Sequence, residues 1–123
     1  MSGKLKVLII DDDPIHLYTA KGLLESSDID VITHQGAFGS IQILKDNMPN
    51  LVLLDVNMPA LSGESLAGLI LPFCTTSSIP IMFYSSNDES NLSDLVVKHG
   101  VAGYICKGDS VSLRTKVRQA LKR

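Results

Sequence analysis

Four short apolar runs in this sequence are each followed by side chains that can do chemistry. These side chains are carboxylates after two runs, hydroxyls after a third and an amine after the last: Asp11, Asp12, Asp13 and Asp55, then Ser85 and Ser86, then Lys107. If the runs are parallel strands of one sheet, their carboxyl ends share one edge, where such sheets bind ligands. The sequence therefore predicts a single polar site built from distant parts of the chain.

Three of these carboxylates can form a cation site. Asp11, Asp12 and Asp55 would repel one another strongly at close range, and a divalent cation would remove that cost. Oxygen ligands, a few waters and a substrate phosphate are the surroundings that Mg²⁺ prefers. The simpler alternative, a solvated acidic loop, does not explain why Lys107 and Ser85 follow the other runs. We therefore expect Mg²⁺ at this site.

With the cation bound, Asp55 can attack phosphorus and form an acyl phosphate. The transferred group spreads negative charge over its oxygens, so the protein has mainly to supply position and positive charge. Lys107 supplies charge, and the Ser85 hydroxyl can donate to a phosphoryl oxygen. Asp13 has a different expected role, because it precedes Pro14 and can cap a helix there.

The apolar pattern predicts the elements that position these groups. Five mostly continuous runs are typical of strands covered on both faces: 5–10, 29–33, 51–54, 81–84 and 101–106. The stretches between them have helical spacing, most clearly around 92–99 and 113–121. A weaker helix spans 63–71, where Pro72 should end or kink it. This alternation predicts an α/β fold with a parallel sheet and right-handed crossovers.

Size and composition restrict the function further. A chain of 123 residues has the size of one domain, so we expect a single domain over residues 1–123. The net charge of -2 gives no basic footprint for nucleic acid or an anionic membrane. The apolar run before Asp11 is too short for a signal peptide or a membrane span, so we expect a cytoplasmic protein. Cys74 and Cys106 are expected to be reduced thiols.

Four segments, taken together, resemble the receiver domain of two-component response regulators. They are VLIIDDDP at 7–14, LVLLDVNMPALSG at 51–63, IPIMFYSS at 79–86 and GYICK at 103–107. Each is a weak motif alone, but all four occur in order and at suitable spacing. The resemblance covers essentially the whole chain. It implies a flavodoxin-like, doubly wound (βα)5 fold with a central five-stranded parallel sheet in the order 2-1-3-4-5.

The resemblance also implies roles for individual residues. Asp55 would be the phosphoacceptor, and Ser85 and Lys107 would bind the phosphoryl group. Tyr104 would be the aromatic side chain that turns inward when Ser85 is recruited.

It implies a ligand set for the cation as well. Asp12 would be the principal ligand of Mg²⁺, together with Asp55, and Asp11 would act largely through the waters of the ion. Asn57 would offer its backbone carbonyl.

The sequence departs from the family pattern at three positions. Ser85 stands where threonine is more common, which keeps the hydroxyl but loosens the rotamer. Ser86 stands where a small alanine is usual. Gly108 follows Lys107 where many members carry proline, often with a cis peptide, so the geometry of that loop is expected to differ. None of these changes removes a group that the chemistry needs.

The expected function is a phosphorylation-dependent signalling switch rather than an enzyme with a substrate of its own. The chain would catalyse only its own phosphorylation and dephosphorylation. A sensor histidine kinase or a phosphotransfer protein would be the donor, and a downstream protein, or a second copy in a phosphorylation-dependent homodimer, would receive the signal. The output face would comprise the helices around 92–99 and 113–121 and the strand 101–106.

Three alternatives belong to other classes. A degenerate receiver would share the fold and bind partners without being phosphorylated, which the intact set of site residues disfavours. A haloacid-dehalogenase-type phosphatase would use Asp11 as nucleophile and Asp13 as general acid, but a suitable late acidic pair is missing. A flavodoxin that binds FMN would not place three aspartates where the phosphate must lie.

Overall fold

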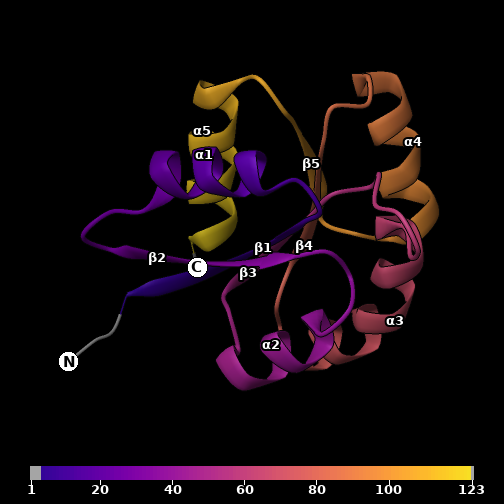
Figure 1. The fold of residues 1–123 in the computed structure, drawn as a ribbon, viewed down its shortest axis with the longest axis horizontal. Helices are drawn as coiled ribbons and strands as arrows, with labels where there is room; N and C mark the ends of the chain where they lie inside the picture. Colours follow the sequence, from indigo (N-terminus) through magenta and orange to yellow (C-terminus); the bar gives the residue numbers. More distant parts are fainter. Residues whose placement is uncertain (1–3, 123) are drawn as a thin grey trace.

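The computed structural model describes residues 4–122. Its centre is one five-stranded parallel sheet in the order β2-β1-β3-β4-β5, which confirms the predicted flavodoxin-like topology (Figure 1). The strands, in chain order, are β1 Leu5–Asp11, β2 Ile29–Gln35, β3 Leu51–Leu54, β4 Ile81–Ser85 and β5 Gly103–Cys106.

Five helices connect and cover the strands. They are α1 Pro14–Leu24, α2 Ser40–Asn47, α3 Gly63–Thr76, α4 Glu89–His99 and α5 Ser110–Leu121. Helices α1 and α5 pack on one face of the sheet, and α2, α3 and α4 pack on the other (Figure 1). In the part of the chain that the structure describes, no helix is long and apolar enough to cross a membrane.

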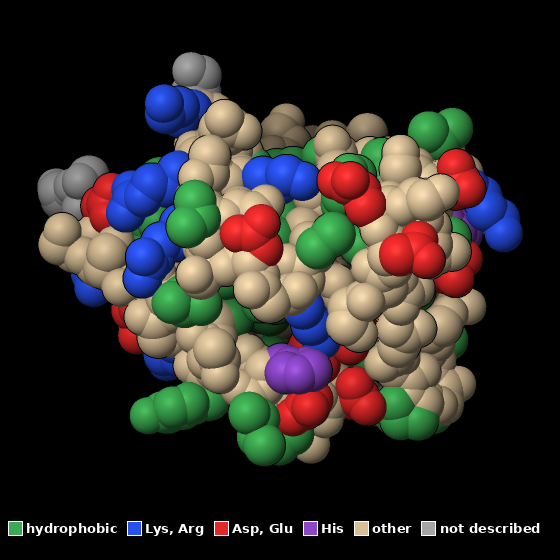
Figure 2. Space-filling model, turned by 90° about the horizontal axis from the view of Figure 1, so that it is seen from above, with side chains coloured by type: hydrophobic (Ala, Val, Ile, Leu, Met, Phe, Trp, Pro, Cys, Tyr) green, Lys and Arg blue, Asp and Glu red, His purple; other side chains and the backbone are tan. Residues whose placement is uncertain are grey.

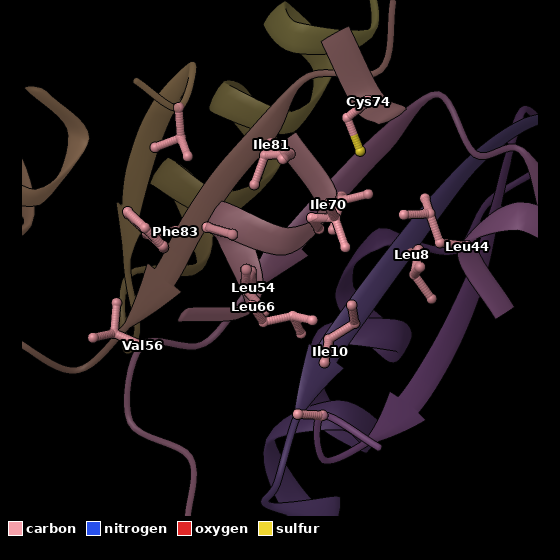
Figure 3. Packing of buried hydrophobic residues seen from close by; sticks show 14 of the residues in the cluster. Leu8, Ile10, Leu44, Leu54, Val56, Leu66, Ile70, Cys74, Ile81 and Phe83 are labelled. Carbon is pink, nitrogen blue, oxygen red and sulfur yellow. The ribbon is translucent and has the colours of Figure 1, made fainter. Parts of the chain in front are cut away.

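The continuous apolar runs form strands because the side chains on both faces are buried. Leu8 and Ile10 contribute to the cluster under α2, α3 and α4, shown in Figure 3, whereas Val7 and Ile9 contribute to the cluster under α1 and α5. The central strands β1, β3 and β4 therefore lie between two apolar layers, which is the environment that parallel strands require, whereas the edge strand β2 is only partly buried.

The register of the sheet sets the geometry of the site. Ile10 of β1 pairs with Leu54 of β3, so Asp11 and Asp55 each come one residue beyond the same rung. Ser85 of β4 pairs with Cys106 of β5, which brings Lys107 to the same edge. Residues separated by up to about a hundred positions thus meet because the strands end together.

The predicted strand ends differ from the observed ones by at most two residues. The strand β3 has the predicted bounds, whereas β1, β2 and β4 continue beyond theirs by one, two and one residues. The strand β5 begins at Gly103 rather than at Val101. Because of the longer β1 and β4, Asp11 and Ser85 are the last residues of strands rather than the first residues after them.

The sequence predicts that Pro72 ends or kinks a helix over 63–71. The first alternative is wrong, because α3 continues through Pro72 to Thr76. A proline ring removes one hydrogen bond and crowds the carbonyl four residues earlier, here that of Gly68. Both Gly68 and Pro72 are exposed, so water can reach the freed carbonyl. The extra turn buries Cys74 completely, which favours continuing the helix. Cys74 and Cys106 are both free thiols, as predicted.

Short polar side chains begin four of the five helices. Asp13, Ser62, Asp88 and Asp109 each accept a hydrogen bond from a backbone N–H of the first turn. The predicted cap is therefore confirmed, with Asp13 Oδ1 accepting from the Ile15 amide at 2.9 Å and Pro14 in the first helical position. These caps fix where α1, α3, α4 and α5 leave the edge of the sheet that carries the acidic residues.

Gly63 allows α3 to start directly against the segment that carries Asp55. Its amide donates to the Val56 carbonyl at 3.0 Å, and a Cβ atom at this position would lie 1.8 Å from the Asp55 carbonyl oxygen. The glycine is therefore required by close approach of two backbones rather than by an unusual backbone angle.

We predict that Gly63→Ala lowers the free energy of unfolding by about 3 kcal/mol or more, because the new methyl group must displace backbone. Gly22→Ala is the matched control, since Gly22 lies inside α1 with open space at the Cβ position. The control should raise stability by about 0.5–1 kcal/mol through helix propensity. Urea unfolding monitored by circular dichroism measures both, and a stable Gly63→Ala protein would contradict the contact.

Candidate functional site

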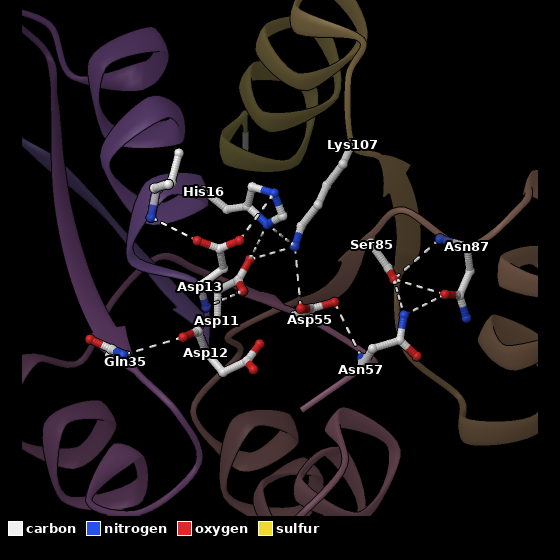
Figure 4. A network of polar contacts seen from close by, with 11 residues as sticks. Asp11, Asp12, Asp13, His16, Gln35, Asp55, Asn57, Ser85, Asn87 and Lys107 are labelled. Atoms are coloured by element: carbon white, nitrogen blue, oxygen red, sulfur yellow. Dashed lines mark hydrogen bonds and ion pairs between the residues drawn. The ribbon is translucent and has the colours of Figure 1, made fainter. Parts of the chain in front are cut away.

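Three carboxylates converge at the carboxyl edge of the sheet. Ligand oxygens of Asp11, Asp12 and Asp55 lie within 4.8 Å of one another. Asp11 ends β1, Asp12 follows it and Asp55 follows β3 (Figure 4). The structure therefore brings together the three carboxylates that the sequence singled out.

The donor set fits a hard divalent cation. Asp11 is fully buried, and its Oδ1 accepts from the Asp13 amide at 3.0 Å. Its Oδ2 has no hydrogen bond from residues 4–122, although the ammonium group of Lys107 lies 2.6 Å away in poor hydrogen-bond geometry. A buried carboxylate oxygen without a donor, next to two further carboxylates, is suited to Mg²⁺ or a similar ion.

Lys107 supplies the positive charge at the site. Its Nζ lies 2.6 Å from Asp11 Oδ2 and 3.2 Å from Asp55 Oδ2, and its side chain is 9% exposed. The backbone amide of Lys107 donates to the Ser85 carbonyl at 2.8 Å, which fixes the root of the side chain beside β4. One ammonium group therefore lies between two buried carboxylates, which stabilises both.

Burial of Asp55 disfavours its charged form. Desolvation is the largest influence and raises the pKa of Asp55 above its ordinary value of 3.8, while the Lys107 charge opposes this and the Asp11 charge adds to it. The Asn57 amide donates to Asp55 Oδ1 at 3.3 Å and also favours the carboxylate. Neutralising this group, by a cation or by modification, therefore relieves a cost of the folded state.

A chain of amide side chains connects the site to α4. Ser85 is fully buried, and its Oγ accepts from Asn57 Nδ2 at 3.3 Å. Asn57 also donates to Asn87 Oδ1 (Figure 4). Asn87 Nδ2 in turn donates to Asn91 Oδ1 at 2.8 Å. Since Asn91 lies in the first turn of α4, the Ser85 hydroxyl is linked to that helix through side chains.

Tyr104 lies at the surface between α4 and α5. Its hydroxyl donates to Glu89 Oε2 at 2.8 Å, and the Lys116 ammonium lies 4.2 Å from the centre of its ring. Lys116 also donates to the Tyr104 carbonyl at 2.8 Å. The hydrogen bond to Glu89 raises the pKa of Tyr104. These two neighbours hold the ring in its observed orientation.

Sequence reasoning did not identify four residues that lie near the predicted ones: His16, Asn87, Glu89 and Lys116. His16 Nδ1 accepts from Lys107 Nζ at 2.9 Å. The sequence did contain a signal for His16. It is the third residue after the capping residue Asp13, so it lies in the first turn of α1, next to the end of β1. Asn87 could also have been identified, because it follows the predicted site residue Ser85 by only two positions. Glu89 and Lys116 depend on how α4 and α5 pack, which the sequence alone does not fix.

The fold and the site define a class, a parallel α/β domain with an acidic cluster and a lysine at the carboxyl edge of its sheet. The chain matches the model of the response regulator receiver domain family over residues 7–118, and it belongs to that family. Receiver domains are in general signalling modules rather than enzymes, and they interact with sensor kinases and downstream partners. Phosphorylation on aspartate and Mg²⁺ binding at an acidic cluster are typical of the family.

Individual relatives agree with this assignment. The chain is 36% identical to PilG of Pseudomonas aeruginosa over 87 residues, covering 71% of this chain and 64% of PilG. It is 35% identical to the transcriptional regulatory protein MctR of Rhizobium johnstonii over 109 residues, covering 85% of this chain and 49% of MctR. It therefore spans 64% of the length of PilG and about half of the length of MctR.

Among solved structures, the chemotaxis protein CheY4 of Vibrio cholerae has the same fold. Its TM-score is 0.85 at 18% identity, with 97% of this chain and 100% of that chain covered.

We predict that Asp55→Asn raises the free energy of unfolding of the metal-free protein by about 1 kcal/mol at neutral pH. The folded pKa of Asp55 is raised, so the folded state binds the proton more tightly than the unfolded chain does. The cost of ionisation therefore sets in as the pH rises above the ordinary value of 3.8 and persists at neutral pH. Thermal unfolding measured from acid to neutral pH checks this.

Addition of Mg²⁺ should reverse the order of stability. A cation that binds only the folded state stabilises by RT ln(1 + [L]/Kd), and Asp55→Asn removes one of its ligands. The wild type should therefore gain more in Tm than the variant, and equal gains would exclude Asp55 as a ligand.

Proposed function

We propose that this chain is a phosphorylation-dependent signalling switch whose phosphoacceptor is Asp55. The observation that carries the proposal is the position of the Asp55 carboxylate. It is 4% exposed, lies at a sheet edge beside Asp11 and Asp12, and has Lys107 at 3.2 Å. A carboxylate so placed can reach a phosphorus atom while the surrounding charges balance the incoming oxygens.

The group transfer needs no proton when the donor is an acyl phosphate, because the leaving group is a carboxylate. A phosphohistidine donor must carry a proton on its other ring nitrogen, so that neutral imidazole leaves. An Asp55 carboxylate oxygen attacks the phosphorus of a phosphohistidine or a small acyl phosphate. The new P–O bond forms as the bond to the leaving group breaks, and that bond's electron pair leaves with the donor. Lys107 and the Ser85 hydroxyl then donate to phosphoryl oxygens. Attack by water on the aspartyl phosphate returns the carboxylate and inorganic phosphate, which is the chain's self-dephosphorylation.

The ligands proposed for Mg²⁺ are the carboxylates of Asp12 and Asp55 and the backbone carbonyl of Asn57, with Asp11 acting mainly through bound water. When bound, the ion neutralises the charge that develops on the phosphoryl oxygens. Asp11 keeps a second role without the ion, because it holds Lys107 at the site.

The output would leave through the face formed by α4, β5 and α5. A groove of about 500 Å³ lies there, lined by apolar side chains such as Met82 and Val96 and by Tyr104 and Lys116. When Ser85 turns toward the phosphoryl group it leaves its amide partners, which loosens the first turn of α4 and lets Tyr104 turn inward. Figure 2 shows the molecule from above, with basic side chains most frequent at the left of the view and acidic ones at its centre and right, where single basic side chains also lie.

The partners follow from this switch. A sensor histidine kinase or a phosphotransfer protein would supply the phosphoryl group, and a downstream protein, or a second copy of the chain, would bind the α4-β5-α5 face. A partner shifts the equilibrium of Tyr104 only by its differential affinity for the two states, typically about 1–3 kcal/mol.

We predict that purified protein incubated with acetyl phosphate and Mg²⁺ gains one acid-stable, base-labile phosphoryl group. Intact-mass spectrometry measures the gain, and EDTA should abolish it. Asp55→Asn should prevent labelling while the circular dichroism spectrum stays that of the wild type. Labelling of Asp55→Asn at the normal rate would overturn the assignment of the phosphoacceptor.

Two neighbouring variants separate this function from a phosphatase that uses Asp11 and Asp13. Asp12→Ala should abolish labelling by removing a cation ligand. Asp13→Ala should still become labelled on Asp55, and it should lose about 1 kcal/mol of stability with its cap. If Asp13→Ala were as inactive as Asp12→Ala, or if the phosphoryl group were found on Asp11, the phosphatase-type site would be favoured.

We predict that Tyr104→Ala leaves labelling of Asp55 nearly unchanged but blunts phosphorylation-dependent association about 5–150-fold, the range of typical allosteric coupling. Amide hydrogen exchange before and after addition of beryllofluoride, an aspartyl-phosphate mimic, locates the response. Changes should include residues 86–107. Changes confined to α1 and α2 would show that the output face lies elsewhere.

A further inference from the structure

The histidine at the rim of the acidic site is not used by the function proposed above. His16 lies in the first turn of α1, and its side chain is 44% exposed. Its Nδ1 lies 2.9 Å from Lys107 Nζ and 3.7 Å from Asp11 Oδ2 (Figure 4). Its other nitrogen, Nε2, lies 3.5 Å from Asp13 Oδ2. The imidazole therefore bridges the helix cap and the lysine.

The chemistry of the ammonium group fixes the state of this imidazole. A lysine ammonium can only donate, so the Nδ1 atom that faces it must be the acceptor and the proton must reside on Nε2. Nε2, which then carries the N–H, lies 3.5 Å from Asp13 Oδ2, a distance that allows an electrostatic contact but no hydrogen bond. Asp13 uses its other oxygen, Oδ1, to cap the helix. The charge of the cap residue can thus favour this orientation of the ring through space, as outer carboxylates commonly do for histidines at functional sites.

We propose that His16 positions the Lys107 ammonium for phosphoryl transfer, with Asp13 orienting the imidazole. The inference rests on the proposed function and names a further residue of the same site. Lys107 has three donors and three neighbouring acceptors, of which Asp11 and Asp55 carry charge and His16 does not.

A neutral acceptor such as His16 can hold the Lys107 ammonium when the two carboxylates have other partners. In the proposed function Asp55 turns its oxygen toward phosphorus, and Asp11 shares its charge with a cation, so both carboxylates have competing partners. His16 Nδ1 takes part in neither of these contacts, so it can hold Lys107 throughout. The contact between Lys107 and Asp55, at 3.2 Å, is long for a charge-assisted hydrogen bond, which agrees with an ammonium held partly away from Asp55. Phosphoryl oxygens then meet a donor that is already oriented.

The kinetic test is the rate of Asp55 labelling by acetyl phosphate in variants of His16. His16→Leu should be slowed about tenfold, the loss expected for one hydrogen bond to a charged group. His16→Gln should recover most of the rate, because its amide oxygen can accept from Lys107. Tyr18→Leu is the control on the same helix. Tyr18 is exposed and lies two positions away, on another side of α1, so this variant should label at the wild-type rate.

The structural readout is the protonation of the ring nitrogens. In slightly alkaline buffer, ¹⁵N–¹H correlation spectra of His16 should show the proton on Nε2, and Asp13→Ser, which retains a capping hydroxyl, should weaken that preference. A proton on Nδ1 would overturn the proposal whatever the kinetics show.

The kinetic outcomes separate this inference from the proposed function. Absence of labelling in the wild type would overturn the function and the role of His16 together. Normal labelling of the wild type with an unchanged rate in His16→Leu would overturn the role of His16 alone. If His16→Leu did not fold, a wild-type rate in Asp13→Ser combined with an unchanged ring proton would overturn it equally.

Discussion

The contact of one ammonium group with two buried carboxylates is the interaction on which the site depends. Lys107 lies within 3.2 Å of both Asp11 and Asp55, and all three side chains are nearly inaccessible to water. Two carboxylates at this depth would be costly without a cation, and removing one partner of such a group leaves an uncompensated charge. One lysine balances only one of the two charges, so the metal-free site retains an excess of negative charge. That excess, increased by Asp12, is what makes the edge a receptor for a divalent cation.

The parallel sheet allows the folded protein to tolerate this cluster of charged groups. Its central strands are covered by apolar layers on both faces, so the charged groups of the site are confined to the carboxyl edge, where loops can reach water. Close backbone approach at Gly63 keeps the Asp55 segment against α3, and the aligned ends of β1 and β3 hold Asp11 beside Asp55. The same alignment that buries Ile10 and Leu54 therefore also creates the repulsion that a cation must relieve.

The fold class and the three clustered carboxylates could be predicted because they depend on local pattern. Continuous apolar runs specify buried parallel strands, and the residues after them must share an edge. The end of α3 could not be predicted in this way. Whether Pro72 stops a helix depends on the exposure of the Gly68 carbonyl and on the burial of Cys74, and both are properties of the packed molecule.

His16 and Lys116 show a second limit of the sequence. His16 contacts Lys107 and Lys116 contacts Tyr104, and both of these partners were predicted. His16 and Lys116 themselves lie on helices, α1 and α5. A helix surface becomes part of a site only through its rotation and its crossing position, which are set by tertiary packing rather than by motif spacing. Residues on strand ends are fixed by register and were therefore found, whereas their neighbours on helices were not.

The arrangement of α4 explains how a change at the acidic edge can reach a surface. The first turn of this helix carries both Asn91, which is linked through Asn87 to the Ser85 hydroxyl, and Glu89, which accepts from Tyr104. Each of these contacts is an ordinary hydrogen bond, worth about 1 kcal/mol in net stability. Exchanging a few of them for contacts with a phosphoryl group is a change of the same size as a typical allosteric coupling, about 1–3 kcal/mol. The contacts of the first turn of α4 are thus weak enough to be exchanged when the site is phosphorylated. The same turn is linked to both groups that the switch must connect, the Ser85 hydroxyl and Tyr104.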